Sequence, residues 1–427
     1  MQQKKNTRWL PLDNAAKIFP ASMRSSWSNV FRISVSFTEK IDPAILQKAL
    51  SRISPRFPSV CVRLRRGLFW YYLEESPFAP KLMKEGCQPL LPMRKKEMGR
   101  IAVRVLYYEN RMAVEFFHAL TDGSGGMVFC KTLAAVYLSE KYGISLPEEG
   151  EFLRPEGEVD PGELEDAFLR YAGARPAKRD TDPAFHLTGE KEPDGFLHDT
   201  CFRLSLSSAL SLAREKKVSL TTLLASSLCF SICKIQKRKV SENRERPVRI
   251  QIPVNLRRHF PSRTLRNFVA VYNVGVEKGE TDADFDEILN LIHHQMGLFN
   301  TPRSLRATFT ANVNSEKGMG IRLVPLFLKN IVMRAVFDKV GESLACLCLS
   351  NLGPQSLGER FDSYIEHFDF IIGPQAKAPY NCGVVSFGDD LCIHLVRNTK
   401  EPELEREFYS HFSSLGLHLT LESNGRS

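Results

Sequence analysis

A histidine and an aspartate four residues apart are the residues in this chain whose types and spacing point most directly to chemistry. His118 and Asp122 lie in the run EFFHALTDGSGG, and Gly123 follows the aspartate. A neutral imidazole can take a proton from a hydroxyl or thiol nucleophile, while a carboxylate four residues later can hold the turn that presents the imidazole. The pattern indicates acyl transfer, but H-x-x-x-D spacings are frequent by chance, so the context decides.

The residues on either side predict a rigid support for this pair. Residues 101–108 and 112–117 are two β-rich runs separated by a polar tripeptide, which is a hairpin pattern, so a strand runs into His118. A Gly- and Ser-rich turn follows, and then a broad apolar face predicts a helix that Gly143 ends. A reactive group between a strand and a helix is held by regular elements on both sides.

The composition is that of a globular protein with two domains or one bilobal unit. The chain has 427 residues, of which 43% are hydrophobic and 25% charged. No apolar run approaches the roughly 18 residues that a membrane span needs, so we expect no transmembrane segment. The N-terminus is basic but lacks the apolar stretch of a secretory signal, and we therefore expect a cytoplasmic protein.

The basic charge balance fits three kinds of partner. A net charge of +9 suits nucleic acid, a membrane surface or a polyanionic cofactor such as coenzyme A. No nucleic-acid fold signature accompanies the basic clusters, so we expect no nucleic acid and read the clusters as solvated surface with one phosphate-binding patch at most.

The ten cysteines are scattered and include no C-x-x-C pair. Cys346 and Cys348 alternate on one face of a predicted strand, where they are either two ligands of a metal site or small packing residues, and packing is the favoured interpretation. We expect reduced core cysteines, and the sequence predicts no metal site.

Both halves of the chain mix strands and helices, which predicts a mixed α/β fold. Residues 1–150 are expected to form an N-terminal lobe that carries the H-x-x-x-D-G motif, 151–195 a Pro-, Gly- and acid-rich linker, and 196–427 a C-terminal lobe. Further strands are predicted at 31–37, 60–64, 68–73, 201–206, 248–256, 268–276, 344–352, 366–372, 383–388 and 391–396. Further helices are predicted at 42–57, 163–171, 207–217, 220–235, 284–299, 322–340 and 403–415.

With two later landmarks, the chain resembles the chloramphenicol acetyltransferase-like superfamily. Residues 253–268, PVNLRRHFPSRTLRNF, look like the family's Pro-Val-Asp-Leu-Arg strand end, and residues 350–354, SNLGP, are similar to the Ser-Asn-x-x-Gly-Pro run of wax ester synthases, shortened by one residue. The resemblance covers nearly the whole chain and is greatest to the bacterial alcohol acetyltransferase-like branch. Plant acyltransferases, wax ester synthases and condensation domains belong to the same superfamily.

The resemblance implies two lobes, each a mixed sheet flanked by helices, with an active-site tunnel between them. His118 would be the general base that deprotonates the acceptor as it attacks an acyl thioester. Asp122 would point away from the substrate and form a buried bidentate pair with an arginine of the other lobe, for which Arg257 is the choice and Arg258 the alternative.

Ser350 and Asn351 would lie near the tunnel, where a hydroxyl or an amide donates to the oxyanion. The alternative is that these two residues shape a turn beside Gly353 and Pro354. Phe117 stands where condensation domains and wax ester synthases usually carry a first histidine, and this departure argues against a peptide synthetase domain.

These implications predict an O-acyltransferase that moves an acetyl or other acyl group from coenzyme A thioester to a small alcohol or another hydroxylated acceptor. Acyl-coenzyme A would be a co-substrate, with no permanently bound cofactor. Two alternatives remain open. One is an enzyme that takes its acyl group from an acyl carrier protein and acts on a lipid, sugar or polyketide hydroxyl, and the other is a catalytically inactive binding module of the same fold.

Overall fold

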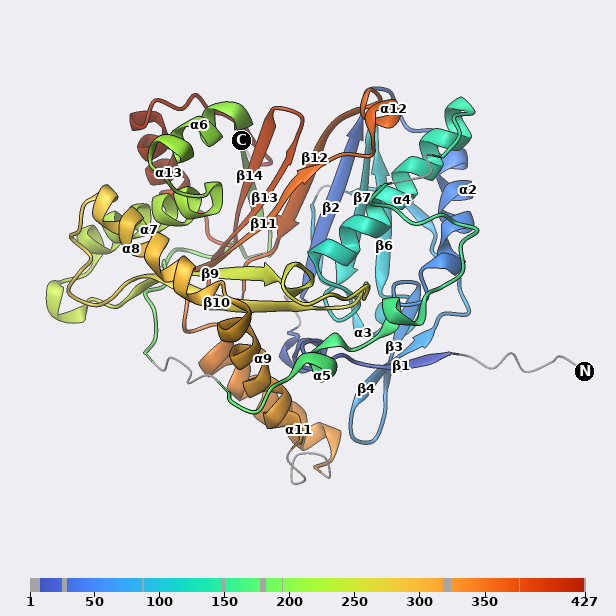
Figure 1. The fold of residues 1–427 in the computed structure, drawn as a ribbon, viewed down its shortest axis with the longest axis horizontal. Coiled ribbons are helices and arrows are strands. Elements are labelled where there is room, and N and C mark those ends of the chain that lie inside the picture. The colour runs from blue at the N-terminus through green and yellow to red at the C-terminus, as the bar shows by residue number, and fades with distance from the viewer. Residues whose placement is uncertain are drawn as a thin grey trace, which may run out of the picture.

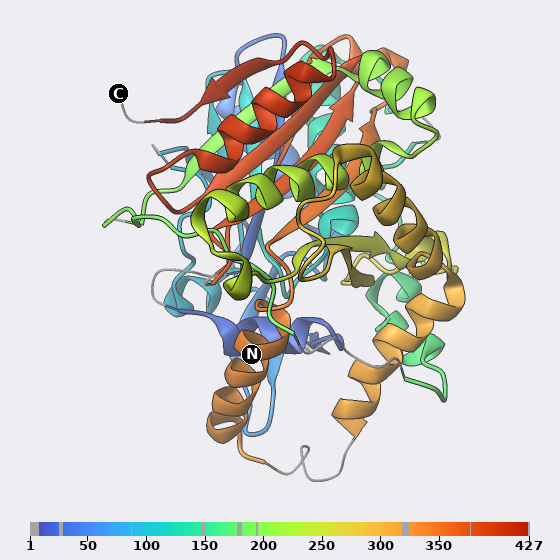
Figure 2. The same cartoon turned by 90° about the vertical axis from the view of Figure 1, so that its left-hand side faces the viewer.

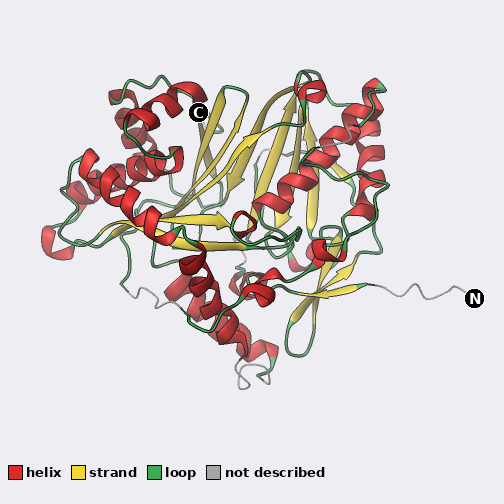
Figure 3. Cartoon of the chain, in the orientation of Figure 1, coloured by secondary structure: helices red, strands yellow, loops and turns green. Residues whose placement is uncertain are grey.

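The protein consists of three β-sheets with helices on their outer faces (Figure 1). The computed structural model describes residues 8–24, 29–86, 88–146, 150–176, 182–193, 195–317, 324–375 and 377–425. Figure 3 shows the strands of the two large sheets lying between two groups of helices. The mixed α/β class predicted from the sequence is confirmed.

The first lobe is built on a five-stranded sheet in which the strand leading to His118 is central. In spatial order the strands are β12 (Ile365–Ile372), β2 (Val30–Phe37), β7 (Arg111–Phe117), β6 (Val103–Tyr108) and β5 (Leu82–Lys84). Helices α2 (Pro43–Ile53) and α4 (Gly123–Tyr142) pack against each other, and α4 contacts β2 and β7. Because β7 pairs with a strand on each side, its end is a fixed position.

Local sequence signals account for these elements. Asp42 caps α2 by accepting hydrogen bonds from the backbone N–H groups of Ala44 and Ile45, with Pro43 at the first helical position. The β6–β7 hairpin turns at Glu109, whose φ is 48°. Helix α4 ends at Gly143, which has a φ of 68° and so takes the left-handed conformation that favours glycine. The predicted hairpin and helix around His118 are both present.

The second lobe is built on a seven-stranded sheet. In spatial order its strands are β10 (Val269–Val276), β9 (Val248–Asn255), β11 (Leu347–Gln355), β13 (Tyr380–Phe387), β14 (Asp390–Arg397), β8 (His198–Ser205) and β15 (Thr420–Ser423). β11 is parallel to both neighbours, and the other pairs are antiparallel. The helices beside it are α6 (Leu206–Glu215), α7 (Leu220–Lys239), α8 (Phe285–Phe299) and α13 (Glu403–Ser414). Figure 2 shows α7 and α13 lying across the outer face of this sheet.

The two lobes share a strand. β12 comes from the C-terminal part of the chain, but it pairs antiparallel with β2 in the sheet of the first lobe. It also crosses β13 so closely that a Cβ atom on Gly383 would lie 2.1 Å from the backbone oxygen of Phe370. The sheets are therefore not divided where the linker divides the chain.

The segment between the lobes is packed rather than free. It contains the turn η3 (Pro161–Leu164) and helix α5 (Ala167–Tyr171), and it buries Phe168 and Phe185 in the core of the second lobe. Its Glu163 accepts hydrogen bonds of 2.5 and 2.7 Å from the guanidinium of Arg56 in the first lobe. The linker thus contacts both lobes through buried groups.

Several elements were not predicted from the sequence. Helix α9 (Pro302–Lys317) is the longest of these; its buried apolar residues, Leu305, Phe309 and Val313, form a single narrow stripe. Helix α11 (Leu326–Val336) lies inside the predicted range 322–340, of which 322–323 fall outside the described residues. Strands β3 (Val62–Arg66) and β4 (Tyr71–Glu75) overlap the predicted strands 60–64 and 68–73, and the turns η2 (Ser54–Arg56) and η6 (Phe337–Gly341) overlap the ends of predicted helices. The short elements that were not predicted are β1 (Trp9–Pro11), η1 (Ala16–Ile18), α1 (Phe19–Ser22), α3 (Lys95–Met98), η4 (Glu242–Arg244), η5 (Leu256–Arg258) and α12 (Glu359–Asp362).

Within the described part of the chain, no single helix has both the length and the apolar content to cross a membrane. Helices α6 and α7 meet that test only when taken together, and they are bent by 84° relative to each other.

Candidate active site

The residues of the H-x-x-x-D-G motif lie in the tight connection between β7 and α4. His118 follows the last residue of β7, and its backbone N–H donates to the oxygen of Asn29, 2.8 Å away, at the start of β2. Asp122 is the N-cap of α4, and its Oδ1 accepts a hydrogen bond of 3.0 Å from the backbone N–H of Gly125. The motif residues are thus fixed by a strand on one side and a helix cap on the other.

Asp122 points away from the imidazole and into a contact with the second lobe. Its Oδ2 lies 2.8 Å from Nη1 of Arg257 and accepts a second hydrogen bond of 2.8 Å from the backbone N–H of Phe268. The Asp122 side chain is 1% exposed. The structure thus pairs Asp122 with the arginine chosen from the sequence.

The geometry of this pair differs from the expected bidentate form. One carboxylate oxygen of Asp122 caps α4, so only the other faces Arg257. The remaining guanidinium nitrogens of Arg257 donate to the backbone oxygens of Thr264 and Arg266, at 2.8 and 2.5 Å. Arg257 therefore also folds the loop that follows β9.

That loop wraps around the motif at further points. The hydroxyl of Thr121 donates to the backbone oxygen of Leu265, 2.6 Å away, and Nδ2 of Asn255 donates to the hydroxyl of Ser124, 2.9 Å away. At Gly125 there is no room for a side chain, because a Cβ atom would lie 2.2 Å from the oxygen of Leu265. The motif connection is consequently assembled from both lobes, and neither lobe alone would fix it.

Asn267, which the sequence interpretation did not single out, holds the imidazole of His118. Its Nδ2 donates to the backbone oxygen of His118 and to Oδ2 of Asp13, at 3.0 and 3.2 Å. Those two acceptors fix the orientation of the amide, so Oδ1 of Asn267 faces Nδ1 of His118 at 3.1 Å. Since Oδ1 can only accept, Nδ1 carries the proton and Nε2 has a free lone pair.

The charge state of His118 is set by its apolar surroundings. The ring of Phe19 stacks on the imidazole at 4.4 Å between centroids, and Phe31 meets it edge-on at 5.1 Å. Burial lowers the pKa of His118, because the imidazolium form loses its solvation there. The residue as a whole nevertheless remains partly exposed. A neutral imidazole with an available nitrogen is the form that a general base requires.

The run SNLGP, residues 350–354, lies against the H-x-x-x-D-G motif. A Cβ atom on Gly123 would lie 2.7 Å from Cδ2 of Leu352, so α4 begins in close contact with β11. Oδ1 of Asn351 accepts from the backbone N–H of Gly353 at 2.8 Å, and its Nδ2 donates to the hydroxyl of Thr221 at 3.3 Å. These contacts support the turn-shaping alternative for Asn351. Ser350 lies in the same strand, opposite Gly383 of β13.

A cavity of about 400 Å³ begins at Pro20, the residue after Phe19, and its charged lining residues are Lys95, Arg334 and Asp338. Its walls come from α1, β4, α3 and α11 and include Pro20, Tyr71, Lys95 and Arg334. A smaller cavity of about 160 Å³ shares Pro20, Met23, Tyr71 and Lys95 with it and adds Leu64, Arg65 and Arg66. Pro20, which lines both cavities, directly follows Phe19, and the ring of Phe19 stacks on His118. The cavities therefore begin next to the residue that covers the imidazole.

No protein-family model matches the chain, and no curated protein matches it in sequence. Solved structures, however, match it over nearly their full lengths. Polyketide synthase associated protein 5 from Mycobacterium tuberculosis superposes with a TM-score of 0.59 at 15% identity, over 95% of this chain and 97% of that one. TRI101 of F. sporotrichioides, complexed with coenzyme A and T-2, gives 0.62 at 12% identity, over 98% and 100%. The starter condensation domain of rhizomide synthetase RzmA, as a mutant in complex with C8-CoA, gives 0.62 at 13% identity, over 95% and 94%.

Identities this low establish the fold. The chain has the two-lobed fold of these solved structures, and the fold that the sequence resemblance implied is confirmed. Membership of the bacterial alcohol acetyltransferase-like branch stays a prediction.

Proposed function

We propose that this protein is an acyltransferase that uses His118 as general base to move an acyl group from coenzyme A thioester to the hydroxyl of an alcohol. The observation that carries the proposal is the contact of Asn267 with Nδ1 of His118, which leaves the lone pair of Nε2 available among the described residues, in a partly exposed residue with apolar neighbours. The fold supports it, because TRI101 and the RzmA domain were crystallised with coenzyme A or an acyl derivative.

The chemistry follows from this tautomer. Nε2 of His118 takes the proton of the acceptor hydroxyl while the hydroxyl oxygen bonds to the thioester carbonyl carbon. When the tetrahedral intermediate collapses, the carbon–sulfur bond breaks, and Nε2 returns the proton to the departing thiolate. The products are an ester and free coenzyme A, and His118 ends neutral as it began.

In this proposal Asp122 and Arg257 take no part in proton transfer. Both side chains make their hydrogen bonds to the connection between β7 and α4 and to the loop after β9. These bonds favour an architectural role for both residues. Ser350 and Asn351 remain candidates for the tunnel wall. The acceptor is proposed only as a hydroxylated small molecule, and the cytoplasm remains the expected compartment.

The test is release of coenzyme A thiol from acetyl-coenzyme A and longer acyl thioesters, measured across a panel of alcohols. We expect His118→Ala to lower kcat by about 10²- to 10⁴-fold, the usual contribution of a positioned base. His418→Ala is the matched control, because His418 is exposed on the second lobe. Equal rates for wild type and His118→Ala would sink the mechanism.

The cavity that begins at Pro20 supports a phosphate-bearing donor. Lys95 and Arg334 line it, and Arg65 and Arg66 line the smaller cavity beside it. If these cations bind the phosphates of coenzyme A, Lys95→Glu should raise KM for acyl-coenzyme A by about tenfold, the effect of losing about 1.4 kcal/mol of binding, with kcat little changed. The control is Lys278→Glu, on the surface after β10. An unchanged KM would place the donor elsewhere.

One observation favours the inactive-module alternative. The ring of Phe19 covers one face of His118, as expected if the site were closed. Thermal shifts with coenzyme A, acyl thioesters and acyl carrier protein separate the candidates, because a ligand of the native state raises the melting temperature. Binding of acyl-coenzyme A without turnover, in wild type and Phe19→Ala alike, would favour the module. A shift with the carrier protein alone would favour the carrier-dependent enzyme.

A further inference from the structure

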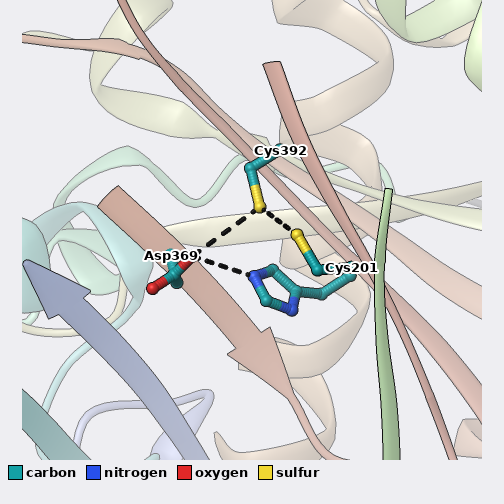
Figure 4. Close-up of side chains that lie close together, drawn as sticks. Cys201, Asp369 and Cys392 are labelled. Carbon is teal, nitrogen blue, oxygen red and sulfur yellow. Dashed lines mark hydrogen bonds and ion pairs between the residues drawn. The ribbon is translucent and has the colours of Figure 1, made fainter. Parts of the chain in front are cut away.

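Away from His118, four side chains that can bind a metal converge between the two large sheets. They are Cys201, Asp369, Cys392 and His394, here called the interlobe cluster. One ligand atom from each lies within 4.8 Å of the others, and all four residues are buried. Figure 4 shows the two sulfur atoms and the carboxylate of Asp369 turned toward a common point.

Sheet register explains how the cluster forms. Cys201 on β8 lies directly opposite His394 on β14, and Cys392 is two residues before His394 and so shares its face of the sheet. Asp369 comes from β12, the strand that belongs to the sheet of the first lobe. Because the two cysteines are far apart in the chain and neighbours in space, no motif spacing in the sequence could predict this cluster.

We propose that the interlobe cluster binds one zinc ion. Two thiolates, an imidazole and a carboxylate make a donor set that suits zinc and completes four-coordination. With Zn–S near 2.3 Å and Zn–N and Zn–O near 2.0–2.1 Å, a tetrahedral site has N···O edges of about 3.3 Å and S···O edges of about 3.5 Å. Nε2 of His394 lies 3.3 Å from Oδ1 of Asp369, and Sγ of Cys392 lies 3.7 Å from the same oxygen.

The sulfur atoms show what binding would change. They are 2.8 Å apart, whereas two zinc-bound thiolates are about 3.8 Å apart. The thiols must therefore separate by about 1 Å as two metal bonds replace their mutual contact. The protons on the two sulfur atoms and on Nε2 of His394 are released to solvent on binding, because thiolates and a neutral imidazole are the ligands.

The groups behind the cluster fit a metal site. Oδ1 of Asp199 lies 2.9 Å from Nδ1 of His394, so Nε2 is the nitrogen turned toward the cluster, as in a carboxylate–histidine–metal arrangement. Arg203 donates to Oδ1 of Asp369 at 3.0 Å and to Asp390 at 2.6 Å. Two thiolates, one carboxylate and Zn²⁺ sum to one negative charge, and the neighbouring guanidinium of Arg203, which also pairs with Asp390 and Glu422, partly offsets it.

Such an ion would be structural and would hold the lobes together. It would tie β12 of one sheet to β8 and β14 of the other. Phe370, next to Asp369, lies 3.6 Å from where a Cβ atom on Gly123 would be, so the same strand also supports the motif connection. The donor set fills all four positions and leaves none open for a substrate.

Metal content tests this inference independently of any activity. Untagged full-length protein is purified under reducing conditions without chelator, exchanged against Zn²⁺, freed of excess metal and measured by mass spectrometry of the elements. We expect about one zinc per chain in wild type, and an at least tenfold loss in Cys201→Ser and Cys392→Ser. Cys346→Ser is the matched control, a buried free cysteine of the same lobe outside the cluster, and should keep its zinc.

A second measurement does not depend on the variants folding. Wild-type protein loaded with Co²⁺ should show a thiolate-to-cobalt charge-transfer band, and a chelator should lower its melting temperature. Wild-type protein that stays metal-free after exchange overturns the proposal, and so does equal zinc in all variants. A Cys201–Cys392 disulfide in protein trapped directly from cells would also overturn it, since the thiols would then form a redox pair.

Discussion

The imidazole of His118 is controlled by groups from three separate parts of the chain. Asn267 from the second lobe fixes the proton on Nδ1, Phe19 from the N-terminal segment covers one face, and Phe31 of β2 meets the ring edge-on. Asp13 stands behind Asn267 and accepts one of its amide hydrogens. In the proposed enzyme, Asn267 is therefore a positioning residue, which acts on the substrate only through His118.

Replacing Asn267 tests this role. Asn267→Ala should lower kcat by about 10- to 100-fold, less than loss of the base itself, with little change in KM. The rate should fall because the proton is no longer held on Nδ1. Nitrogen-15 NMR of labelled histidine reports the tautomer directly and should show Nδ1–H in wild type and a mixture in the variant. An unchanged tautomer with a reduced rate would show that Asn267 acts only through the fold.

The pH dependence of the reaction should reflect the burial of His118. Burial lowers its pKa, and activity requires the neutral imidazole, so kcat/KM should rise with pH through a midpoint below the 6.5 or so of an ordinary histidine and stay level through neutrality. Phe19→Ala should admit water, raise this pKa and move the acidic limb to higher pH. A wild-type midpoint above about 6.5 would contradict the assignment of His118 as the base.

At this scale the sequence predicted what lies within a motif and missed what the fold assembles. His118, Asp122 and Arg257 belong to recognisable runs, and the structure brings Asp122 and Arg257 into contact. Asn267 lies inside the landmark segment 253–268, where a polar residue next to a strand is one signal that was available. Asp13 and Phe19 lie in a segment with no pattern, and only tertiary packing places them beside His118.

Among the elements, the connection between β7 and α4 and the loop after β9 stabilise each other. Asp122 is the shared residue, since one oxygen caps α4 and the other accepts from Arg257 and Phe268. Asn at this position can still cap the helix but carries no charge, so Asp122→Asn separates the two contributions.

We expect Asp122→Asn to lower the free energy of unfolding by about 3 kcal/mol, because it leaves the Arg257 guanidinium without its buried partner. Activity should fall with it, since the loop that carries Asn267 is also held by Arg257. Denaturant unfolding measures the change, and a double-mutant cycle with Arg257→Ala should show that the second substitution costs less than the first. Arg263→Ala, at an exposed arginine paired with Asp160, should change stability by less than about 0.5 kcal/mol. Additive losses would refute the coupling.

Elements with strong local signals were predicted close to their observed bounds, and weak ones were missed. The Asp42–Pro43 start and the Gly143 stop frame α2 and α4. Helix α9 has one narrow apolar stripe in a polar run, so its periodicity is faint and its helical state depends on packing against the second core. Strand β15 is exposed along its length and, within the described residues, pairs only with β8, and its sequence carries no alternation to indicate it.

At the scale of the molecule, strand β12 connects the two lobes. It completes the sheet that supports His118, faces the second sheet at the interlobe cluster, and crosses β13 at Gly383. Chain order alone suggests that residues after 195 build a lobe of their own, and no local pattern reveals that one strand pairs across. Where β12 crosses β13 there is no space for a side chain at Gly383. The close packing of the two lobes at this point therefore requires glycine.

Gly383→Ala should therefore destabilise the protein severely. Its Cβ atom would lie 2.1 Å from the backbone oxygen of Phe370. Each of the two strands is hydrogen-bonded in a sheet, so its backbone cannot move aside as the end of a side chain can. We expect a loss of more than about 3 kcal/mol in unfolding free energy, at the upper end of single substitutions, together with loss of activity because β12 also carries Phe370 against the motif connection. Gly297→Ala is the matched control: nothing lies within 4 Å of its Cβ position in α8, and alanine there should stabilise the helix by up to about 1 kcal/mol. Similar stabilities for the two variants would mean that β12 and β13 do not cross as closely as described, and the proposed joint support of the active site by both lobes would fall with that contact.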